Sequence, residues 1–149
     1  MESCYKLESL PEGFGELNLT KLVLGKTPLD GADETYAILG KIATLTELDL
    51  SYSEIATLPE RFGDLKNLKE LDMHECEALE SLPERFGDLK NLKELNLYCC
   101  GSFESLPERF GDLVNLQTLN LACTAVVTLP KRFGELKSLT ELKLYNCQS

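Results

Sequence analysis

The hydrophobic positions of this chain follow two periods that alternate along its length. The spacing L-x-x-L-x-L, with Met in one copy, occurs at residues 19–24, 45–50, 68–73, 92–97, 116–121 and 139–144. In the L-x-L half of each copy, apolar and polar residues alternate, which is the pattern of a short β-strand with one buried face. The sequence therefore predicts six short strands whose leucines point toward one core.

A second apolar period lies between the strands. In PERFGDLKNL at residues 59–68, the residues Phe62, Leu65 and Leu68 recur every three positions. This spacing suits a helical or 3₁₀ turn, with Pro59 tolerated at its start and Gly63 loosening it. We therefore expect a short helical return segment between successive strands.

Together the two elements form a repeat. Prolines at positions 11, 59, 83, 107 and 130 each begin a variant of P-E-x-F-G-[DE]-L, and LPERFGDLKNLKEL occurs unchanged at residues 58–71 and 82–95. One strand and one return cannot bury their own leucines, so successive units must stack. The expected fold class is α/β, a curved solenoid with a parallel sheet of about six strands on its concave face and helical or 3₁₀ segments on its convex face.

A small side chain follows each strand and is expected to turn inward and hydrogen-bond the backbone of the bend. These residues are Thr27, Ser53, Cys76, Cys100, Thr124 and Cys147. After a cysteine the next apolar anchor is three positions on, as at Leu79 and Phe103. After serine or threonine it is two positions on, as at Ile55 and Val126. This choice explains why the repeats are 24 or 23 residues long.

The combined pattern, L-x-x-L-x-L-x-x-[CT] followed by LP-x-x-F-G-x-L, covers nearly the whole chain. It resembles the leucine-rich repeats of plant-type intracellular proteins, notably the repeat regions of nucleotide-binding resistance receptors and of Ras-group-related scaffolds. The resemblance implies recognition of a protein partner or intramolecular docking, and no more, because one fold hosts many functions. The nucleotide-binding and signalling domains of those families have no counterpart in these 149 residues.

We expect one domain over residues 1–149, with a half repeat at 1–18 and regular repeats over 45–149. Residues 25–44 lack the LP and FG signature and lengthen their unit to 26 residues. Inward anchors remain available there at Leu29, Ile38, Leu39 and Ile42. Asp33 is placed to cap a helix that begins at Glu34. Neither end carries an evident polar cap, so the chain is a fragment, a complete small protein, an assembly subunit or a consensus design.

Composition restricts the partners. Twenty-five Asp and Glu against fifteen Lys and Arg give a net charge of −10, which disfavours nucleic acid and anionic membranes and favours a basic or mixed protein surface. The first residues lack the features of a secretory signal, and no stretch is long enough to span a membrane, so we expect a cytoplasmic protein. The six cysteines are expected to be free thiols, because a chain of this size builds its own core.

The polar residues of the strands are expected to line the concave face in columns about 4.7–4.9 Å apart. The first column, which makes the face acidic toward its first half, holds Lys21, Glu47, Glu70, Glu94, Thr118 and Glu141. The residues that we predict to bind a partner come from the later columns and are Asp49, Tyr52, Asp72, His74, Glu75, Asn96, Tyr98, Asn120 and Tyr145. Tyrosines anchor and carboxylates steer a basic partner. The alternative is that tyrosine only suits a sheet surface and the acidic columns only maintain solubility.

Neither catalysis nor a cofactor is predicted. His74 is the only histidine, and a cluster with Ser51 and Glu75 on an open sheet would lack a pocket and an oxyanion hole. Cys99 and Cys123 take equivalent positions on adjacent strands and are near enough to pair on oxidation. A zinc site with His74 has no clear fourth ligand and no C-x-x-C spacing, so no metal is predicted.

Two functions remain open. The first is a protein-interaction module that binds its partner through the concave face. The second is a structural subunit or fragment whose open ends, residues 7–17 and 139–147, are buried by neighbouring chains or domains.

Overall fold

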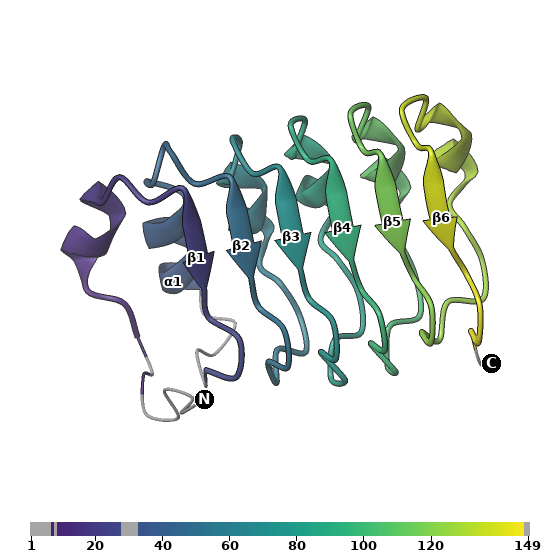
Figure 1. Cartoon of the computed structure of the whole chain (residues 1–149), viewed down its shortest axis with the longest axis horizontal. Helices are drawn as coiled ribbons and strands as arrows, with labels where there is room; N and C mark the ends of the chain where they lie inside the picture. Colours follow the sequence, from purple (N-terminus) through teal and green to yellow (C-terminus); the bar gives the residue numbers. More distant parts are fainter. Residues whose placement is uncertain (1–6, 8, 28–32, 148–149) are drawn as a thin grey trace.

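The computed structural model describes residues 7, 9–27 and 33–147, and these form a curved solenoid (Figure 1). Its six strands pair in parallel, in chain order, in a single sheet. They are β1 (Lys21–Val23), β2 (Glu47–Asp49), β3 (Glu70–Asp72), β4 (Glu94–Asn96), β5 (Thr118–Asn120) and β6 (Glu141–Lys143). The six predicted strands and the predicted solenoid are thus confirmed.

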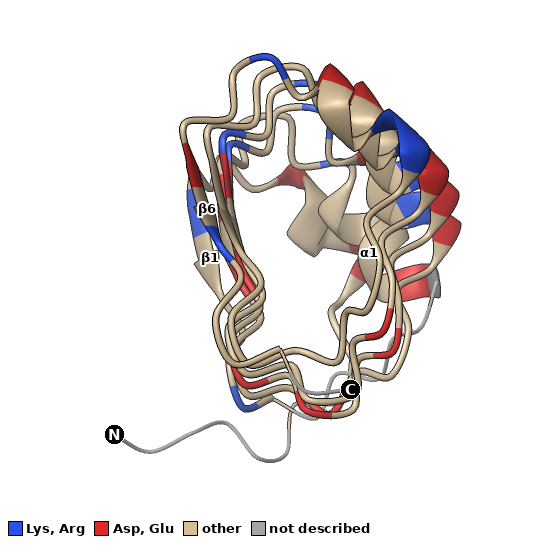
Figure 2. Cartoon of the chain, turned by 90° about the vertical axis from the view of Figure 1, so that its right-hand side faces the viewer, with Lys and Arg blue, Asp and Glu red and all other residues tan. Residues whose placement is uncertain are grey.

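The return segments form the opposite wall, seen end on in Figure 2. Five of them are 3₁₀ helices of five residues: η1 (Glu12–Glu16), η2 (Glu60–Asp64), η3 (Glu84–Asp88), η4 (Glu108–Asp112) and η5 (Lys131–Glu135). Each is preceded by the proline of its LP signature. This proline has an extended backbone conformation, and the chain changes direction where the 3₁₀ helix begins after it. The irregular repeat instead contains the α-helix α1 (Asp33–Leu39), which begins one residue before the expected start.

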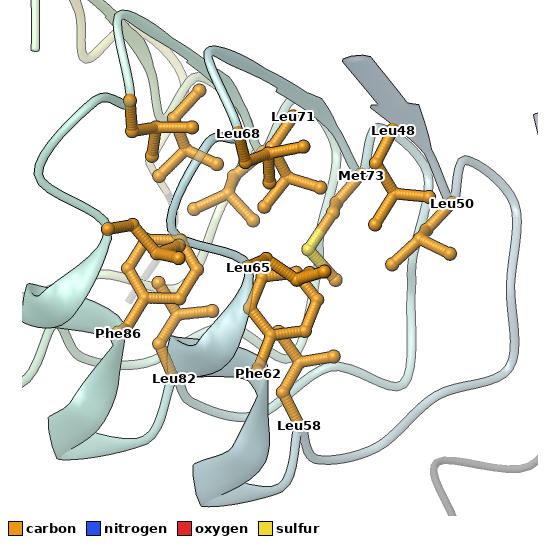
Figure 3. Packing of buried hydrophobic residues seen from close by; sticks show 14 of the residues in the cluster. Leu48, Leu50, Leu58, Phe62, Leu65, Leu68, Leu71, Met73, Leu82 and Phe86 are labelled. Atoms are coloured by element: carbon orange, nitrogen blue, oxygen red, sulfur yellow. The ribbon is translucent and has the colours of Figure 1, made fainter. Parts of the chain in front are cut away.

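The core lies between the two walls. Strand pairing aligns the middle leucines of successive repeats, such as Leu48 with Leu71 and Leu71 with Leu95. Figure 3 shows Leu48 and Leu71 on the strand side of this core and Phe62 and Phe86 on the side of the 3₁₀ segments. The predicted anchors Ile38, Leu39 and Ile42 of the irregular repeat are also buried, whereas the predicted anchor Leu29 lies outside the described residues.

Aromatic rings form a continuous stack behind the leucines. Phe62, Phe86 and Phe110 follow one another with centroid separations of 5.7 and 6.2 Å and nearly parallel planes, and Phe133 continues the stack at 6.4 Å. Helix α1 contributes Tyr36, whose ring lies 5.3 Å from that of Phe62 and is tilted by 59°. Tyr36 thus occupies the place of the missing phenylalanine, so the irregular repeat is packed like its neighbours.

In three of the four RFG motifs, the glycine is required by packing against the next turn. A Cβ atom at Gly87 would collide with the backbone carbonyl oxygen of Arg109, and Gly63 and Gly111 face the next turn in the same way. The sequence reasoning assigned glycine the role of loosening the 3₁₀ turn. The structure gives a different reason: none of these three glycines has a positive φ, and at each of them the backbone of the next repeat leaves no room for a side chain.

Arginines and aspartates link the same turns on the outside. The Nη2 group of Arg109 donates to Asp88 at 2.6 Å, and its Nε donates to Asp112 at 3.2 Å. Arg85 bridges Asp64 and Asp88 with the same distances. Partial burial raises the pKa of Asp88, but the hydrogen bond from Arg109 and the positive charges nearby outweigh it and hold this pKa below its usual value. The outer wall is therefore a network of partly shielded ion pairs.

The predicted ladder of small side chains is present. The hydroxyl groups of Ser53 and Thr124 donate to the carbonyl oxygen three residues earlier, at 2.5 and 2.7 Å. The thiols of Cys76 and Cys100 instead reach the carbonyl oxygens of the preceding repeat, at 3.2 and 3.1 Å. The longer C–S bond permits this reach to the backbone of the preceding repeat. The hydroxyl groups bond the backbone of their own bend, and Ser53 Oγ also lies 3.3 Å from Cys76 Sγ.

One backbone feature was not predicted. The residue before each ladder position has a positive φ, between 54° and 60°, and these residues are Lys26, Tyr52, Glu75, Cys99, Cys123 and Asn146. A left-handed conformation is unfavourable for side chains other than Gly, Asn and Asp. Of the six residues, only Asn146 suits it.

Replacing Glu75 by Asn should therefore stabilise the fold. We expect Glu75→Asn to raise the free energy of unfolding by about 0.5–1 kcal/mol, because asparagine tolerates a positive φ better than glutamate. Urea denaturation followed by circular dichroism measures the change. The control is Glu77→Asn, since Glu77 is exposed and has no positive φ. An equal gain from both variants would show that backbone conformation is not the cause.

Candidate functional site on the concave face

A shallow groove of about 340 Å³ runs across the sheet face. Its polar lining comes from the two outward positions of the strands, which alternate with the buried leucines. The lining residues with polar side chains are Lys21, Glu47, Asp49, Glu70, Asp72, Glu94, Asn96, Thr118, Asn120 and Lys143. Five carboxylates and two lysines thus face one open surface.

Both lysines of the groove are already paired. Lys21 Nζ lies 2.8 Å from Glu47 at one end, and Lys143 Nζ lies 3.0 Å from Glu141 at the other. The hydrogen bond with Glu47 raises the pKa of Lys21 and keeps it charged. Glu70 and Glu94, between these ends, form no ion pair within the part of the chain that the structure describes. The centre of the groove therefore carries uncompensated negative charge.

The second outward column has a structural role as well. The Oδ1 atoms of Asp49, Asp72, Asn96 and Asn120 each accept a hydrogen bond from the backbone N–H two residues later, at 2.9–3.2 Å. Such turns close the ends of β2, β3, β4 and β5. Asp72 also accepts from the Asn96 side chain at 3.0 Å, which ties β3 to β4. Four of the nine predicted binding residues are thus partly committed to the fold.

An aromatic rim borders the groove where the strands end. Lys26 Nζ lies 4.3 Å from the centroid of the Tyr52 ring, and that ring meets His74 edge-on at 4.8 Å. His74 Nδ1 lies 2.9 Å from Asp72 Oδ1. His74 is therefore held by Tyr52 and Asp72, and among the described residues no side-chain hydrogen bond joins it to Ser51 or Glu75.

The rim continues over the later repeats. Tyr98 is half-buried, and Tyr145 is 55% exposed. The hydrogen bond with Cys99 and the neighbouring thiols raise the pKa of Tyr98 to about 12. Glu75 is half-buried on the same rim. The structure therefore divides the predicted residues into two groups, namely Asp49, Asp72, Asn96 and Asn120 in the groove, and Tyr52, His74, Glu75, Tyr98 and Tyr145 on its rim.

The predicted columns are present, but the set of predicted binding residues is incomplete. Glu47, Glu70 and Glu94 line the groove and were not among the predicted binding residues. The available signal was their place in the first outward column of the strands. What the sequence does not show is which carboxylates of that column are paired with lysine.

Three further observations describe the chemistry of the molecule. Cys76, Cys99, Cys100, Cys123 and Cys147 are free thiols. Within the described ranges, no group of three or more His, Cys, Asp or Glu side chains is arranged to hold a metal ion. In the same part of the chain, no helix has the length and hydrophobicity needed to cross a membrane.

Comparison with known proteins identifies the repeat. The family model described as Leucine Rich Repeat matches residues 91–113. A probable disease resistance protein of Arabidopsis thaliana is 37% identical over 79 residues, which is 53% of this chain. The chain is a leucine-rich-repeat solenoid. It spans only 4% of the length of the Arabidopsis protein.

Solved structures agree with this family. A leucine-rich-repeat protein of Leptospira interrogans superimposes with a TM-score of 0.74 and 30% identity, over 96% of this chain and 41% of its own. The leucine-rich-repeat domain of the type III effector XopL gives 0.60 at 23% identity, over 95% and 59% of the two chains, and supports the fold alone. A plant peptide hormone receptor in complex with RGF2 gives 0.57 at 25% identity, over 92% and 26%. Leucine-rich repeats are commonly protein-interaction modules, and their fold is typical of binding proteins and not of enzymes.

Proposed function

We propose that this leucine-rich-repeat protein is an interaction module that binds a protein partner of basic or mixed surface through its concave face. The observation that carries the proposal is the uncompensated charge of Glu70 and Glu94 at the centre of the groove. Lysine or arginine side chains of a partner would pair with these carboxylates, whose geometry is fixed by adjacent strands.

The rim supplies the apolar part of such an interface. Tyr52 is 45% exposed and is held between Lys26 and His74, so its ring is ordered before any partner binds. Ordered aromatic side chains beside charged groups are typical of residues that dominate binding energy. We therefore assign anchoring to Tyr52, His74, Tyr98 and Tyr145, with Glu75 beside them, and orientation to the carboxylates of the groove.

Two features support a binding role in the cytoplasm. The groove is open, so nothing in it would exclude water from a reacting group, and this supports a binding protein and not an enzyme. The described cysteines are free, as expected in a reducing compartment. The complex of the plant receptor with RGF2 shows that a related solenoid binds a ligand of its own.

Charge removal in the groove tests the proposal. Random short peptides are selected on the immobilised protein, and the dissociation constant of the tightest binder is then measured by isothermal titration calorimetry. We expect the selected peptide to be rich in Lys and Arg. The Glu70→Gln/Glu94→Gln variant should bind it at least about tenfold more weakly than the intact protein does, and added salt should weaken its binding to the intact protein. The control is Glu77→Gln/Glu104→Gln, which removes the same charge at exposed positions outside the groove. Equal affinity in both variants would refute the proposal.

A second candidate function rests on the exposed end of the solenoid. Leu142 and Leu144 are 37% and 42% exposed, although the equivalent Leu119 and Leu121 of the preceding repeat are fully buried. A structural subunit or fragment would cover this end with a neighbouring chain or domain. Sedimentation of the intact protein decides between the two: a monomer that binds the peptide fits the interaction module, and self-association abolished by Leu142→Glu fits the structural subunit.

A further inference from the structure

Two half-buried cysteines lie side by side at the rim of the groove. Cys99 and Cys123 are each three residues beyond Asn96 and Asn120, which are register partners in the parallel pair β4 and β5. The backbone N–H of Cys99 donates to the carbonyl oxygen of Ala122 at 3.0 Å, which fixes the two turns against each other. Equivalent positions on paired strands are separated by about 4.8 Å, which is within the Cα separation of 4.4–6.8 Å of a disulfide.

The side chains of this pair leave neighbouring turns from equivalent positions. The backbone N–H of Cys123 donates to the carbonyl oxygen of Tyr145 at 3.0 Å, as that of Cys99 does to Ala122, so the two turns have the same backbone pairing. Both cysteines have a positive φ, 57° and 59°, so their side chains leave the backbone in the same direction. The two side chains therefore lie on one surface.

Exposure separates this pair from a second pair of neighbouring cysteines. Cys76 and Cys100 are fully buried, and each donates its S–H to a backbone carbonyl oxygen of the ladder. Cys99 and Cys123 are both half-buried, and no ladder hydrogen bond holds them. Thiol–disulfide exchange requires access of the attacking sulfur to the reagent. The rim pair meets this requirement and the buried pair does not.

We propose that Cys99 and Cys123 form a dithiol site that is reversibly oxidised to an intrachain disulfide by small disulfides of the glutathione class. The site is independent of the concave-face proposal, because it depends only on the two thiols and their register.

The exchange balances without any further reactant. The thiolate of one cysteine attacks a sulfur of oxidised glutathione, so the bond between the two glutathione sulfurs breaks and a mixed disulfide forms. The second cysteine, as thiolate, attacks the protein sulfur of this mixed disulfide and forms the Cys99–Cys123 bond. Two molecules of reduced glutathione leave and carry the two protons.

Burial and the neighbouring thiol raise the pKa of Cys99, so at neutral pH the thiol stays protonated and exchange is slow. Its rate should rise roughly tenfold per pH unit below that pKa, because the thiolate is the attacking species. At neutral pH, thiol–disulfide exchange is therefore expected to need a long incubation. Mild alkali should accelerate it.

The test is incubation of the full chain with oxidised glutathione, followed by alkylation of the remaining thiols and tryptic peptide mapping. We expect the intact protein to lose the mass of two hydrogen atoms, with a cross-link between the peptides of residues 94–109 and 110–131. Because the first peptide contains both Cys99 and Cys100, fragmentation must place the cross-link at Cys99. Cys99→Ser and Cys123→Ser should each abolish it, whereas Cys147→Ser and Cys4→Ser should leave it unchanged.

A second readout is the ionisation of Tyr98. Oxidation removes the Cys99 thiol from its hydrogen bond with Tyr98, so the pKa of Tyr98 should fall from about 12 toward the ordinary value of tyrosine. NMR titration of the ¹³C-labelled tyrosine ring in reduced and oxidised protein measures this fall. A cross-link at Cys76–Cys100, a cross-link between chains, or glutathione adducts that never resolve to the intrachain bond would each overturn the proposal.

Discussion

Gly87→Ala is expected to lower the free energy of unfolding by about 3 kcal/mol, although it adds a single methyl group. The added Cβ would collide with the backbone carbonyl oxygen of Arg109 in the next turn. A flexible side chain could move aside, but a backbone atom moves only with its repeat. The collision would therefore separate η3 from η4 and also strain the ion pairs of Arg109 with Asp88 and Asp112.

The matched control is the equivalent glycine of the last repeat. Gly134 occupies the same place in its RFG motif, and nothing lies within 4 Å of a Cβ added there. Gly134→Ala should leave the free energy of unfolding unchanged or raise it by about 0.4–1 kcal/mol, through reduced freedom of the unfolded chain. Urea denaturation of both variants measures the difference. A similar loss in both would mean that the glycine serves the 3₁₀ turn itself and not the packing of repeats.

Phe86→Ala is expected to cost about 3–5 kcal/mol of stability, which is the range for removal of a buried aromatic ring. Phe86 is fully buried and lies between Phe62 and Phe110 in the aromatic stack. The cavity would open in the middle of the core, where the two neighbouring turns are fixed by their own strands and cannot close it. The loss should appear as a lower urea midpoint in denaturation followed by circular dichroism.

Phe133→Ala provides the comparison for that variant. Phe133 is only half-buried and stacks on Phe110 at the end of the row. Its removal should cost clearly less than that of Phe86, since less apolar area leaves the core and solvent can enter the space. Equal losses would contradict a core that is continuous through the middle repeats and open at the last one.

Much of the fold could be predicted because each element has its own hydrophobic period. The alternation in L-x-L requires a strand with one buried face, and the spacing of Phe62, Leu65 and Leu68 requires a tight turn. All three of these residues are buried, as are Leu79 and Phe103, the anchors that follow the ladder cysteines. Periodicity within the repeat thus fixed which side chains point inward.

The features that were missed arise between repeats and not within them. Tyr36 completes the aromatic stack from a segment without the FG signature, so no sequence match indicated it. The contact of Gly87 with Arg109 and the reach of the Cys76 thiol to Leu50 both join residues more than 20 positions apart. The positive φ of Glu75 gives no sequence signal, because glutamate is not favoured in that conformation.

The candidate site was predictable to a similar extent. Strand periodicity places Glu70 and Glu94 on the concave face and predicts its aromatic neighbours. It does not show that Lys21 and Lys143 form ion pairs with Glu47 and Glu141. These pairs leave the unpaired negative charge concentrated at the centre of the groove. Nor does it show that Asp49 closes its own strand, since that requires the local backbone geometry.

The most direct test of the concave-face proposal is to locate a bound basic peptide on the folded protein. The peptide selected on the immobilised chain is titrated into ¹⁵N-labelled protein, and the change in chemical shift is recorded for every backbone amide. The proposal predicts that the largest changes fall on the strands β2 to β5 and on the rim at Tyr52, His74 and Tyr98. Changes confined to the 3₁₀ segments of the convex wall, or to the exposed last repeat around Leu142 and Leu144, would contradict it.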